Sequence, residues 1–497
     1  MRYLVTASEM RRYDSNTIEK IGIAACVLME RAALAAAAVV EEHCAGLPGK
    51  KYILIMAGMG NNGGDGLALG RILSERDYQV EIWCVGDRKK ASGQWKQQRE
   101  ILGSYSVEFT EAPKRQEYTV MVDALFGVGL SREVTGSFKE AIQIFQSLEG
   151  WKLALDLPSG IDSDTGRIWG YAVRVDRTVT FGFCKRGLVL YPGCEYAGRV
   201  ETADIGISSR SFLGSEPEMY AYDEEASSLL PRRAKGGNKG TFGKVLLAAG
   251  SENMAGAAVL AARAAYRAGA WMIKVITPEA NRMILHQAVP EALVGTVENL
   301  EEGMEWADVI GIGPGLGKTD TALSCLKRVI CGSDKPLLVD ADGLNLLSEH
   351  SRLRNVLEEQ GMEGRSVVLT PHVGEMARLT GISAAECKQK LLDCGRELAV
   401  MFHATVVAKD ARTFICGKGR RTCVNLSGNS GMATAGSGDV LAGIITAFLA
   451  QGMEAFEAAA VGAYVHGIAG DAAAAEKGEH AVMAGDIAEH ATSFCSK

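Results

Sequence analysis

Short apolar segments alternate with helical stretches along this chain of 497 residues, and they do so in two separate series. In the first half, the apolar runs have the length and composition of strands that are buried on both faces of a parallel sheet. Helical stretches such as Leu67–Arg76 and Phe138–Leu148 lie between them. The alternation predicts a doubly wound α/β sheet. Its predicted strands are Tyr52–Ala57, Gln79–Val85, Val120–Asp123, Lys152–Leu157 and Arg177–Phe181.

A mixed, polar segment interrupts this pattern from Ser208 to Lys239, and a second alternating series follows it. A late hairpin is expected from Arg412–Cys416 and Arg421–Val424. Long helices are expected at Val440–Gln451 and Ala455–Ala475. The sequence therefore predicts two tandem α/β domains, at residues 1–215 and 225–497. The strands predicted in the second series are Lys244–Ala249, Met272–Ile276, Val309–Ile312, Pro336–Asp340, Val367–Thr370 and Thr405–Ala408.

Composition argues against several classes of partner. The net charge is −7, so the chain lacks the basic footprint typical of proteins that bind nucleic acid or anionic membranes. The Ala-rich stretch Ala32–Val40 is too short to span a bilayer. The 12 cysteines form neither a CxxC pair nor a Cys/His cluster, which argues against a zinc site or a disulfide framework. Charged residues also precede any signal-length apolar core at the N-terminus. We expect a cytoplasmic protein with reduced thiols.

The segment with the clearest chemistry is a loop of small residues from Asn429 to Asp439, which runs directly into an apolar helix. Its glycines let backbone N–H groups point toward one place, and the helix dipole adds to their effect, so the loop favours an anion. Asp439 lies at the junction and can accept a proton from a hydroxyl. A phosphate held beside a base is suited to phosphorylating an alcohol. The alternative is an ordinary helix cap, because Gly, Ser and Asp are common at helix starts.

Three strand ends in the first half carry glycine-rich or polar clusters. One runs from Gly58 to Gly66 and contains five glycines, which let the phosphates of a ligand approach the backbone. The others run from Asp123 to Arg132 and from Asp156 to Gly166. Because the carboxyl ends of strands line the ligand crevice of an open α/β sheet, the three clusters should converge. Each cluster alone could instead be turn chemistry.

These three motifs, together with Phe181-Gly-Phe-Cys-Lys-Arg-Gly-Leu188, resemble the NAD(P)H-hydrate epimerase family in content and order. The resemblance implies a Rossmann-like three-layer domain that epimerises C6 of hydrated NADH or NADPH (NADHX, NADPHX). It implies a potassium ion near Asn62, Asp123 and Ser159, whose oxygen atoms suit a hard cation. Asp156 is the carboxylate expected to transfer the proton, either with ring opening or with loss of water. The implied substrate contacts are Asn61, Asn62, Gly63, Gly64, Asp65, Gly127, Val128, Gly129, Leu130, Ser131, Arg132, Glu133 and Asp156.

The second half resembles the ribokinase-like, ADP-dependent (S)-NAD(P)H-hydrate dehydratase family. The resemblance implies substrate contacts from Ala257, Gly315, His372 and Asp439. It implies ADP contacts from Lys409, Asp410, Ala411, Arg412, Thr413 and Gly438, with Mg²⁺ on the nucleotide phosphates. The two halves together resemble bacterial repair enzymes that combine both activities. The motifs of the second half are Lys239–Ser251, Gly311–Gly317, Asp340–Leu347, Thr370–Met376, Val407–Thr413, Asn429–Asp439 and His466–Asp471.

Dehydration needs activation of the C6 hydroxyl because hydroxide is a poor leaving group. Asp439 is expected to deprotonate this hydroxyl while the amides of residues 436–439 hold the transferring phosphoryl group. The phosphate ester then leaves. Some residues in the motifs of the second half have simpler explanations when each is considered alone. His372 could cap a helix, Lys409 could be a solvated strand end, and Asp340 could be a turn residue.

The chain departs from the common pattern of the dehydratase family at five positions, none of which is a proposed catalytic group. Asn238 replaces a common His, and Trp271 stands where a small residue is usual. The other three departures are Gly343 for Ala, Val373 for Pro and Ser430 for Pro.

Two other functions are compatible with parts of the sequence. A ribokinase-like small-molecule kinase would release its phosphate ester intact, and its first half would then be a non-catalytic Rossmann-like binding domain. A binding module for protein or RNA is the other alternative. The presence of Asn62, Asp123 and Asp156, together with the acidic net charge, argues against it. Homo-oligomerisation is expected from the resemblance alone.

Overall fold

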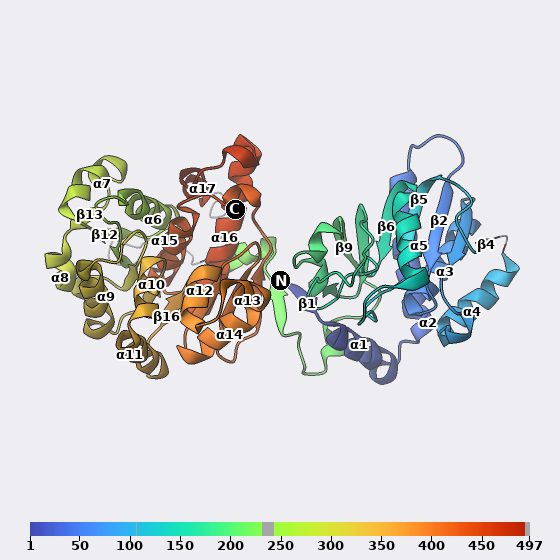
Figure 1. The fold of residues 1–497 in the computed structure, drawn as a ribbon, viewed down its shortest axis with the longest axis horizontal. Helices are drawn as coiled ribbons and strands as arrows, with labels where there is room; N and C mark the ends of the chain where they lie inside the picture. Colours follow the sequence, from blue (N-terminus) through green and yellow to red (C-terminus); the bar gives the residue numbers. More distant parts are fainter. Residues whose placement is uncertain (106, 231–242, 493–497) are drawn as a thin grey trace. The chain divides into compact units, whose positions relative to one another are not determined.

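The computed structural model describes residues 1–105, 107–230 and 243–492. The chain divides into two compact units, Arg2–Glu218 and Met219–Lys497, and the second of these includes Met1. Figure 1 traces the chain from blue at the N-terminus to red at the C-terminus. Each unit is built around a parallel or mainly parallel sheet with helices between its strands, so the predicted α/β class is confirmed.

The described residues of the unit Arg2–Glu218 form a seven-stranded sheet with the order β4-β3-β2-β5-β6-β7-β9. All neighbouring strands of this sheet are parallel. A separate parallel pair joins β1 (Arg2–Val5) and β8 (Cys184–Lys185). The sheet strands are β2 (Tyr52–Ala57), β3 (Gln79–Cys84), β4 (Glu108–Thr110), β5 (Glu117–Ala124), β6 (Glu149–Leu155), β7 (Arg177–Phe181) and β9 (Arg199–Ala203). The helices are α1 (Ala7–Ser15), π-helical η1 (Asn16–Ile21), α2 (Ala25–Cys44), α3 (Asn61–Glu75), α4 (Gly93–Ile101) and α5 (Gly136–Ser147).

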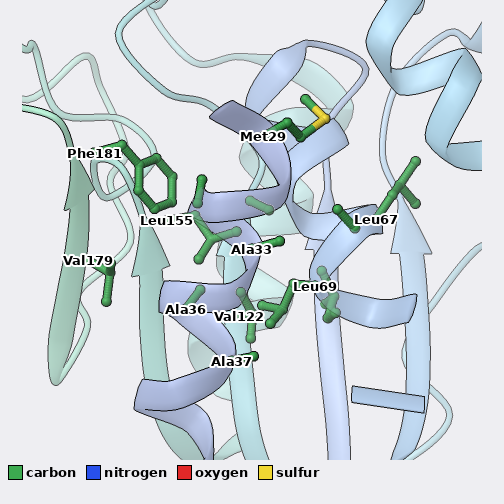
Figure 2. Packing of buried hydrophobic residues seen from close by; sticks show 14 of the residues in the cluster. Met29, Ala33, Ala36, Ala37, Leu67, Leu69, Val122, Leu155, Val179 and Phe181 are labelled. Carbon is green, nitrogen blue, oxygen red and sulfur yellow. The ribbon is translucent and has the colours of Figure 1, made fainter. Parts of the chain in front are cut away.

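Two apolar cores lie on opposite faces of this sheet. Ile53 and Ile55 of β2 belong to the core that also contains residues of α2 and α3, whereas Leu54 and Met56 pack with residues of α5. This alternation is expected because successive side chains of a strand point to opposite faces. Figure 2 shows the first core, where the alanine-rich face of α2, including Ala33, lies over the strands. The unit is therefore a three-layer α/β/α structure.

The sheet of the second unit has the order β13-β12-β11-β14-β15-β16-β17-β18-β19-β10. Strands β11 to β17 are all parallel to one another, and β18 is antiparallel to both β17 and β19. The short strand β10 is parallel to β19. The strands are β10 (Met219–Ala221), β11 (Lys244–Ala248), β12 (Met272–Ile276), β13 (Leu293–Gly295), β14 (Val309–Ile312), β15 (Leu337–Val339), β16 (Val367–Leu369), β17 (Thr405–Ala408), β18 (Thr413–Gly417) and β19 (Thr422–Asn425).

Helices cover both faces of this second sheet. A Cβ added to Gly303 of α8 would meet Leu246 of β11, whereas a Cβ added to Gly311 of β14 would meet Leu247 and Thr446 of α15. Adjacent β11 residues therefore face different helical layers. The helices are α6 (Ala255–Arg267), α7 (Arg282–Ala288), α8 (Leu300–Trp306), α9 (Asp320–Gly332), α10 (Asp342–Glu349), α11 (Ser351–Met362), α12 (Val373–Thr380), α13 (Ala384–Gln389), α14 (Leu391–Met401), α15 (Ser437–Ala450), α16 (Ala455–Lys477) and α17 (Ala484–His490).

Every strand that the sequence predicts is present, several with the predicted bounds, and the hairpin is β18 and β19. Short strands such as β4, β9 and β13 were not predicted, because three to five residues with few apolar side chains give no clear pattern. Helix α3 begins at Asn61 rather than Leu67, since its first turn is formed by the glycine motif itself. Asn238 and the start of the Lys239–Ser251 motif lie outside the described residues. In the described parts of the chain, no helix has the length and apolar character needed to cross a membrane.

Candidate functional sites

A cavity of about 830 Å³ lies at the carboxyl ends of the strands in the unit Arg2–Glu218. The strand order reverses between β2 and β5, and such switch points are where open α/β sheets bind ligands. The three polar clusters found in the sequence therefore converge here. The predicted residues that line the cavity are Asn61, Asn62, Asp65, Gly127, Val128, Gly129, Leu130, Ser131, Arg132 and Asp156.

Asp156 follows β6 and has a positive φ of 67°, a backbone conformation that is uncommon for residues other than glycine. Its carboxylate accepts a hydrogen bond from the ammonium of Lys185 at 2.5 Å. Lys185 is only 1% exposed and also donates to Thr180 Oγ1 and to the carbonyl of Phe181. Buried charges are stable when they are paired and hydrogen-bonded in this way. The ion pair therefore fixes the position of the Asp156 carboxylate at the cavity wall.

Two further carboxylates, Asp14 and Asp65, line the same cavity as Lys185. Burial raises the pKa of Asp65 well above its ordinary range, and the charges of Asp156 and Asp14 raise it further. Burial also raises the pKa of Asp14. Asp14 and Lys185 were not among the predicted site residues. Lys185 lies within the Phe181–Leu188 motif, which was the available signal, whereas no motif pointed to Asp14 on α1.

Beneath the cavity, Asp123 is fully buried and forms hydrogen bonds with Ser159. It accepts from the Ser159 hydroxyl at 2.6 Å and from the Ser159 and Leu125 amides at 2.7 and 3.1 Å. Burial raises the pKa of Asp123 to about 6, while the bonds from Ser159 lower it. Asn62 donates to the carbonyl of Phe126, and its own Oδ1 is buried without a hydrogen-bond partner. The Phe126 carbonyl also accepts from the Ser159 hydroxyl at 3.4 Å, so it connects Asn62 with the Ser159–Asp123 pair.

Gly63, Gly64 and Glu133 do not line the cavity. A Cβ added to Gly63 would lie 1.9 Å from the carbonyl oxygen of Gly58, so this position has room only for glycine. A Cβ added to Gly64 would lie 2.9 Å from the Met29 side chain. Both glycines therefore have a packing role in the first turn of α3, and Glu133 is exposed.

In the second unit, Gly436 has a positive φ of 89° and precedes α15, whose third residue is Asp439. Burial raises the pKa of the Asp439 carboxyl to about 7, and the charges of Asp340 and Asp342 also raise it, whereas Lys409 lowers it. A Cβ added to Gly438 would lie 3.4 Å from Lys409 Nζ. The structure therefore places a carboxylate, a lysine and a helix N-terminus together.

Lys409 is held by Asp340 rather than by Asp439. Its ammonium lies 2.8 Å from Asp340 Oδ1, and the Thr370 hydroxyl donates to the same oxygen at 2.6 Å. Burial alone would lower the pKa of Lys409, but the carboxylates of Asp340 and Glu375 outweigh it and raise the pKa. Lys409 is 18% exposed at its side chain, so it is not simply a solvated strand end.

His372 caps α12, as the simpler interpretation of the sequence allows. Its Nδ1 accepts from the Gly374 amide at 2.9 Å, and its Nε2 lies 3.2 Å from Glu375 Oε1. The side chain is nevertheless 54% exposed, and the backbone of His372 forms a parallel bridge with Lys409. A histidine that caps one helix can therefore still present its ring beside the Lys409 strand end.

Ala257 and Gly315 also lie together, because a Cβ added to Gly315 would be 2.7 Å from Ala257 Cβ. Leu260, one turn further along α6, packs on Gly436. Of the predicted nucleotide residues, Asp410 and Ala411 are exposed, and Arg412 and Thr413, the first residue of β18, are half-buried. In the described residues, no group of three His, Cys, Asp or Glu side chains could hold a metal ion.

The fold and the two sites define a two-unit α/β enzyme whose second unit is ribokinase-like. A solved ribokinase-like superfamily protein from Enterococcus faecalis V583 is similar to it, with 31% identity and a TM-score of 0.50, covering 56% of this chain and 95% of that protein. A family model described as NAD(P)H-hydrate dehydratase matches residues 245–493. A model described as YjeF-related protein N-terminus matches residues 25–187.

The similarity to named relatives extends over nearly the whole chain. The bifunctional NAD(P)H-hydrate repair enzyme Nnr of Moorella thermoacetica is 37% identical, over 98% of this chain and 95% of the relative. The Thermofilum pendens protein of the same name is 36% identical, over 95% and 92%. The chain belongs to the family of bifunctional NAD(P)H-hydrate repair enzymes. The predicted combination of an NAD(P)H-hydrate epimerase and a dehydratase is thereby confirmed.

Proposed function

We propose that the second unit dehydrates the S epimer of NADHX and NADPHX with Asp439 as the general base. The observation that carries this proposal is a carboxyl group with a pKa of about 7 at the N-terminus of α15, beside Lys409. Asp439 accepts the proton of the C6 hydroxyl while the hydroxyl oxygen of the substrate takes the phosphoryl group. N–H groups at the start of α15 stabilise the transferring charge, and Lys409 adds a positive charge beside them.

ADP with Mg²⁺ supplies the phosphoryl group when it is bound, with the ion shielding the nucleotide phosphates. The proposed nucleotide contacts are the strand end and turn from Lys409 to Thr413, and Gly438. Ala257, Gly315 and His372 are proposed to contact the hydrated nicotinamide. After phosphorylation, the ring nitrogen lone pair expels phosphate from C6, and loss of a ring proton restores NAD(P)H. The phosphate ester is therefore an activated intermediate rather than a product.

The cavity of the first unit is proposed to bind and epimerise the same hydrated nucleotides. Asp156 would exchange a proton with the reacting ring, and Lys185 would hold the Asp156 carboxylate in place. The turn Asn61–Asp65 and the segment Gly127–Glu133 are proposed as substrate contacts. Gly63 and Gly64 would act through the backbone of the α3 N-terminus, where N–H groups favour phosphate.

A potassium ion fits the position between Asn62, Asp123 and Ser159. The Asn62 Oδ1 atom is buried and lacks a partner, which is costly unless a donor or a cation approaches it. The Asp123 carboxyl and the Ser159 hydroxyl would supply further oxygen atoms, and the Phe126 carbonyl connects this pair with the Asn62 side chain. When bound, the ion would supply positive charge beneath the substrate cavity. Homo-oligomerisation stays a prediction from the family resemblance, and a cytoplasmic location stays a prediction from the composition.

The test is to incubate the protein with mixed NADHX epimers and ADP and to follow the absorbance of NADH. Conversion of both epimers is expected. Conversion of half of the material would overturn the epimerase assignment of the first unit. A stable phosphorylated product without NADH would overturn the dehydratase mechanism in favour of a kinase.

A further inference from the structure

The His466–Asp471 motif lies on α16, and the proposed chemistry gives it no role. The same helix contacts the glycine-rich segment Ser427–Ser437, which leads into α15 and which we call the anion loop. The contacts fall at both ends of this loop and in its middle. The loop determines where the N–H groups at the start of α15 point, so its rigidity bears directly on phosphoryl transfer.

Asp471 holds the first end of the anion loop. Its Oδ2 accepts from the Gly428 amide at 2.9 Å, and its Oδ1 accepts from the Asn429 side-chain amide at 2.9 Å. The Asn429 Oδ1 in turn accepts from the Gly431 amide at 3.0 Å. One carboxylate thus orders the turn through both of its oxygens, and hydrogen bonds to a charged acceptor are stronger than neutral ones.

Close packing on α16 holds the first residue of the loop, Ser427, and Met432 in its middle. A Cβ added to Gly467 would lie 2.0 Å from Ser427 Oγ, and one added to Gly470 would lie 2.2 Å from Met432 Sδ. The Ser427 hydroxyl also donates to the Tyr464 carbonyl at 3.0 Å. Gly467 therefore lets the loop backbone lie directly against the helix, and Gly470 leaves room for the Met432 side chain.

His466 holds the second end of the loop. Its Nε2 lies 3.2 Å from Ser437 Oγ, two residues before Asp439. Burial lowers the pKa of His466 to about 4, and the nearby charge of Lys409 lowers it further. The imidazole is therefore neutral at the pH of an ordinary assay, which leaves one ring nitrogen available to accept the Ser437 hydroxyl hydrogen.

We propose that His466 and Asp471 are positioning residues for phosphoryl transfer, because together they hold both ends of the anion loop on α16. The inference rests on the proposed dehydratase mechanism. Preorganised N–H groups stabilise developing charge without reorganisation, whereas a loop that must first be ordered loses this advantage. A shift of about 1 Å in a reacting group can reduce a rate by roughly 100-fold. Loss of either residue should therefore affect turnover and nucleotide affinity together.

The experiment compares Asp471→Ala and His466→Ala with Glu457→Ala, which removes an exposed carboxylate from the first turn of the same helix. We expect each of the first two substitutions to lower the dehydration kcat by about 10- to 100-fold and to raise the KM for ADP, with the control unchanged. Asp471→Asn keeps the Oδ1 acceptor and His466→Gln keeps a polar tip, so both should recover part of the loss. The rate of epimerisation in the same samples is the control, because an unchanged rate shows that the protein is still folded.

A residue that merely stabilised the fold would reduce the amount of active enzyme and leave the KM for ADP unchanged. Unchanged kcat and KM in Asp471→Ala, in a protein where Asp439→Asn abolishes dehydration, would overturn this inference alone. Wild-type dehydration by Asp439→Asn would instead overturn the proposed mechanism. If the alanine variants fail to fold, hydrogen exchange on the wild-type enzyme decides the matter. Protection of the Gly428 and Gly431 amides without nucleotide is expected, and exchange as fast as in the exposed turn at 418–420 would contradict it.

Discussion

The two units place a carboxylate and a lysine at the carboxyl ends of parallel strands, but they connect these groups differently. In the first unit, Lys185 pairs directly with Asp156, the proposed acid–base group. In the second, Lys409 pairs with Asp340, and within the described residues no ion pair joins Asp439 to a cation. The ion pair in the first unit fixes the position of the Asp156 carboxylate. The arrangement in the second leaves a carboxyl group that changes protonation state near neutral pH.

The backbone shows the same contrast. Asp156 has a positive φ, and strained backbone of this kind persists only where the surroundings hold it in place. Asp439 lies in the regular first turn of α15, where the strain is confined to Gly436, a residue that adopts positive φ readily. The ion pair with Lys185 therefore accompanies the positive φ of Asp156, whereas Asp439 lies in regular helical backbone and has no such ion pair among the described residues.

The largest expected effect separates the two sites completely. Asp439→Asn should reduce dehydration by about 10²–10⁴-fold, because an amide cannot accept the proton of the C6 hydroxyl. Epimerisation should keep its wild-type rate, since the site of the first unit is built from other residues. The measurement is the rate of NADH formation from the S epimer, with epimer interconversion followed by chromatography. Loss of both activities in a folded variant would contradict the existence of two independent sites.

The reverse experiment removes the ion pair of the first unit. Lys185→Met leaves a nearly buried carboxylate without its partner, so epimerisation should fall by roughly 100-fold as Asp156 loses its position. The first unit should also lose about 3–5 kcal/mol of stability, the usual effect of breaking a buried pair. Chromatography of the two epimers and thermal unfolding measure these changes.

The matched control for this substitution is Lys96→Met, which alters an exposed lysine of α4. The double variant Asp156→Asn with Lys185→Met tests the electrostatic explanation, because it removes both charges. It should recover much of the lost stability without recovering epimerisation. Equal stability losses in the single and double variants would show that packing of the lysine, and not its charge, is what matters.

The sequence predicted the fold class because apolar runs and glycine turns are local signals, and many of the candidate residues that it named at strand ends line one cavity. Asp439 and Lys409 were both candidates because each lies in a motif, and the structure brings Lys409 beside Gly438, the neighbour of Asp439. The pairing of Lys185 with Asp156 was not predicted, because it joins residues 29 positions apart through the packing of β8 beside the cavity. The contribution of Asp14 depends on where α1 packs, which only the folded chain shows.

The pH dependence of dehydration tests whether Asp439, unlike the ion-paired Asp156, changes its protonation state near neutral pH. Because burial raises the pKa of Asp439 to about 7, the base is mostly protonated at pH 6 and mostly ionised at pH 8. The value of kcat/KM should therefore rise about tenfold over this range and level off above it. Lys409 lowers the pKa of Asp439, so Lys409→Met should shift the midpoint to higher pH. A flat wild-type profile between pH 6 and 8 would exclude Asp439 as the titrating base.

The smallest expected effect concerns potassium, which the proposal places in the first unit only. A bound ion stabilises the folded state by about 1.4 kcal/mol when its concentration is tenfold above its Kd. Replacing K⁺ with a large organic cation should therefore lower the unfolding temperature of the first unit by roughly 3–5 °C.

Asn62→Leu removes the unpartnered oxygen and should make this unit insensitive to the exchange of cations. Asn61→Leu, a change at the neighbouring exposed residue, should keep the full response. Equal sensitivity of both variants would place the ion elsewhere, because the Asn62 Oδ1 is buried without a partner whereas Asn61 is exposed.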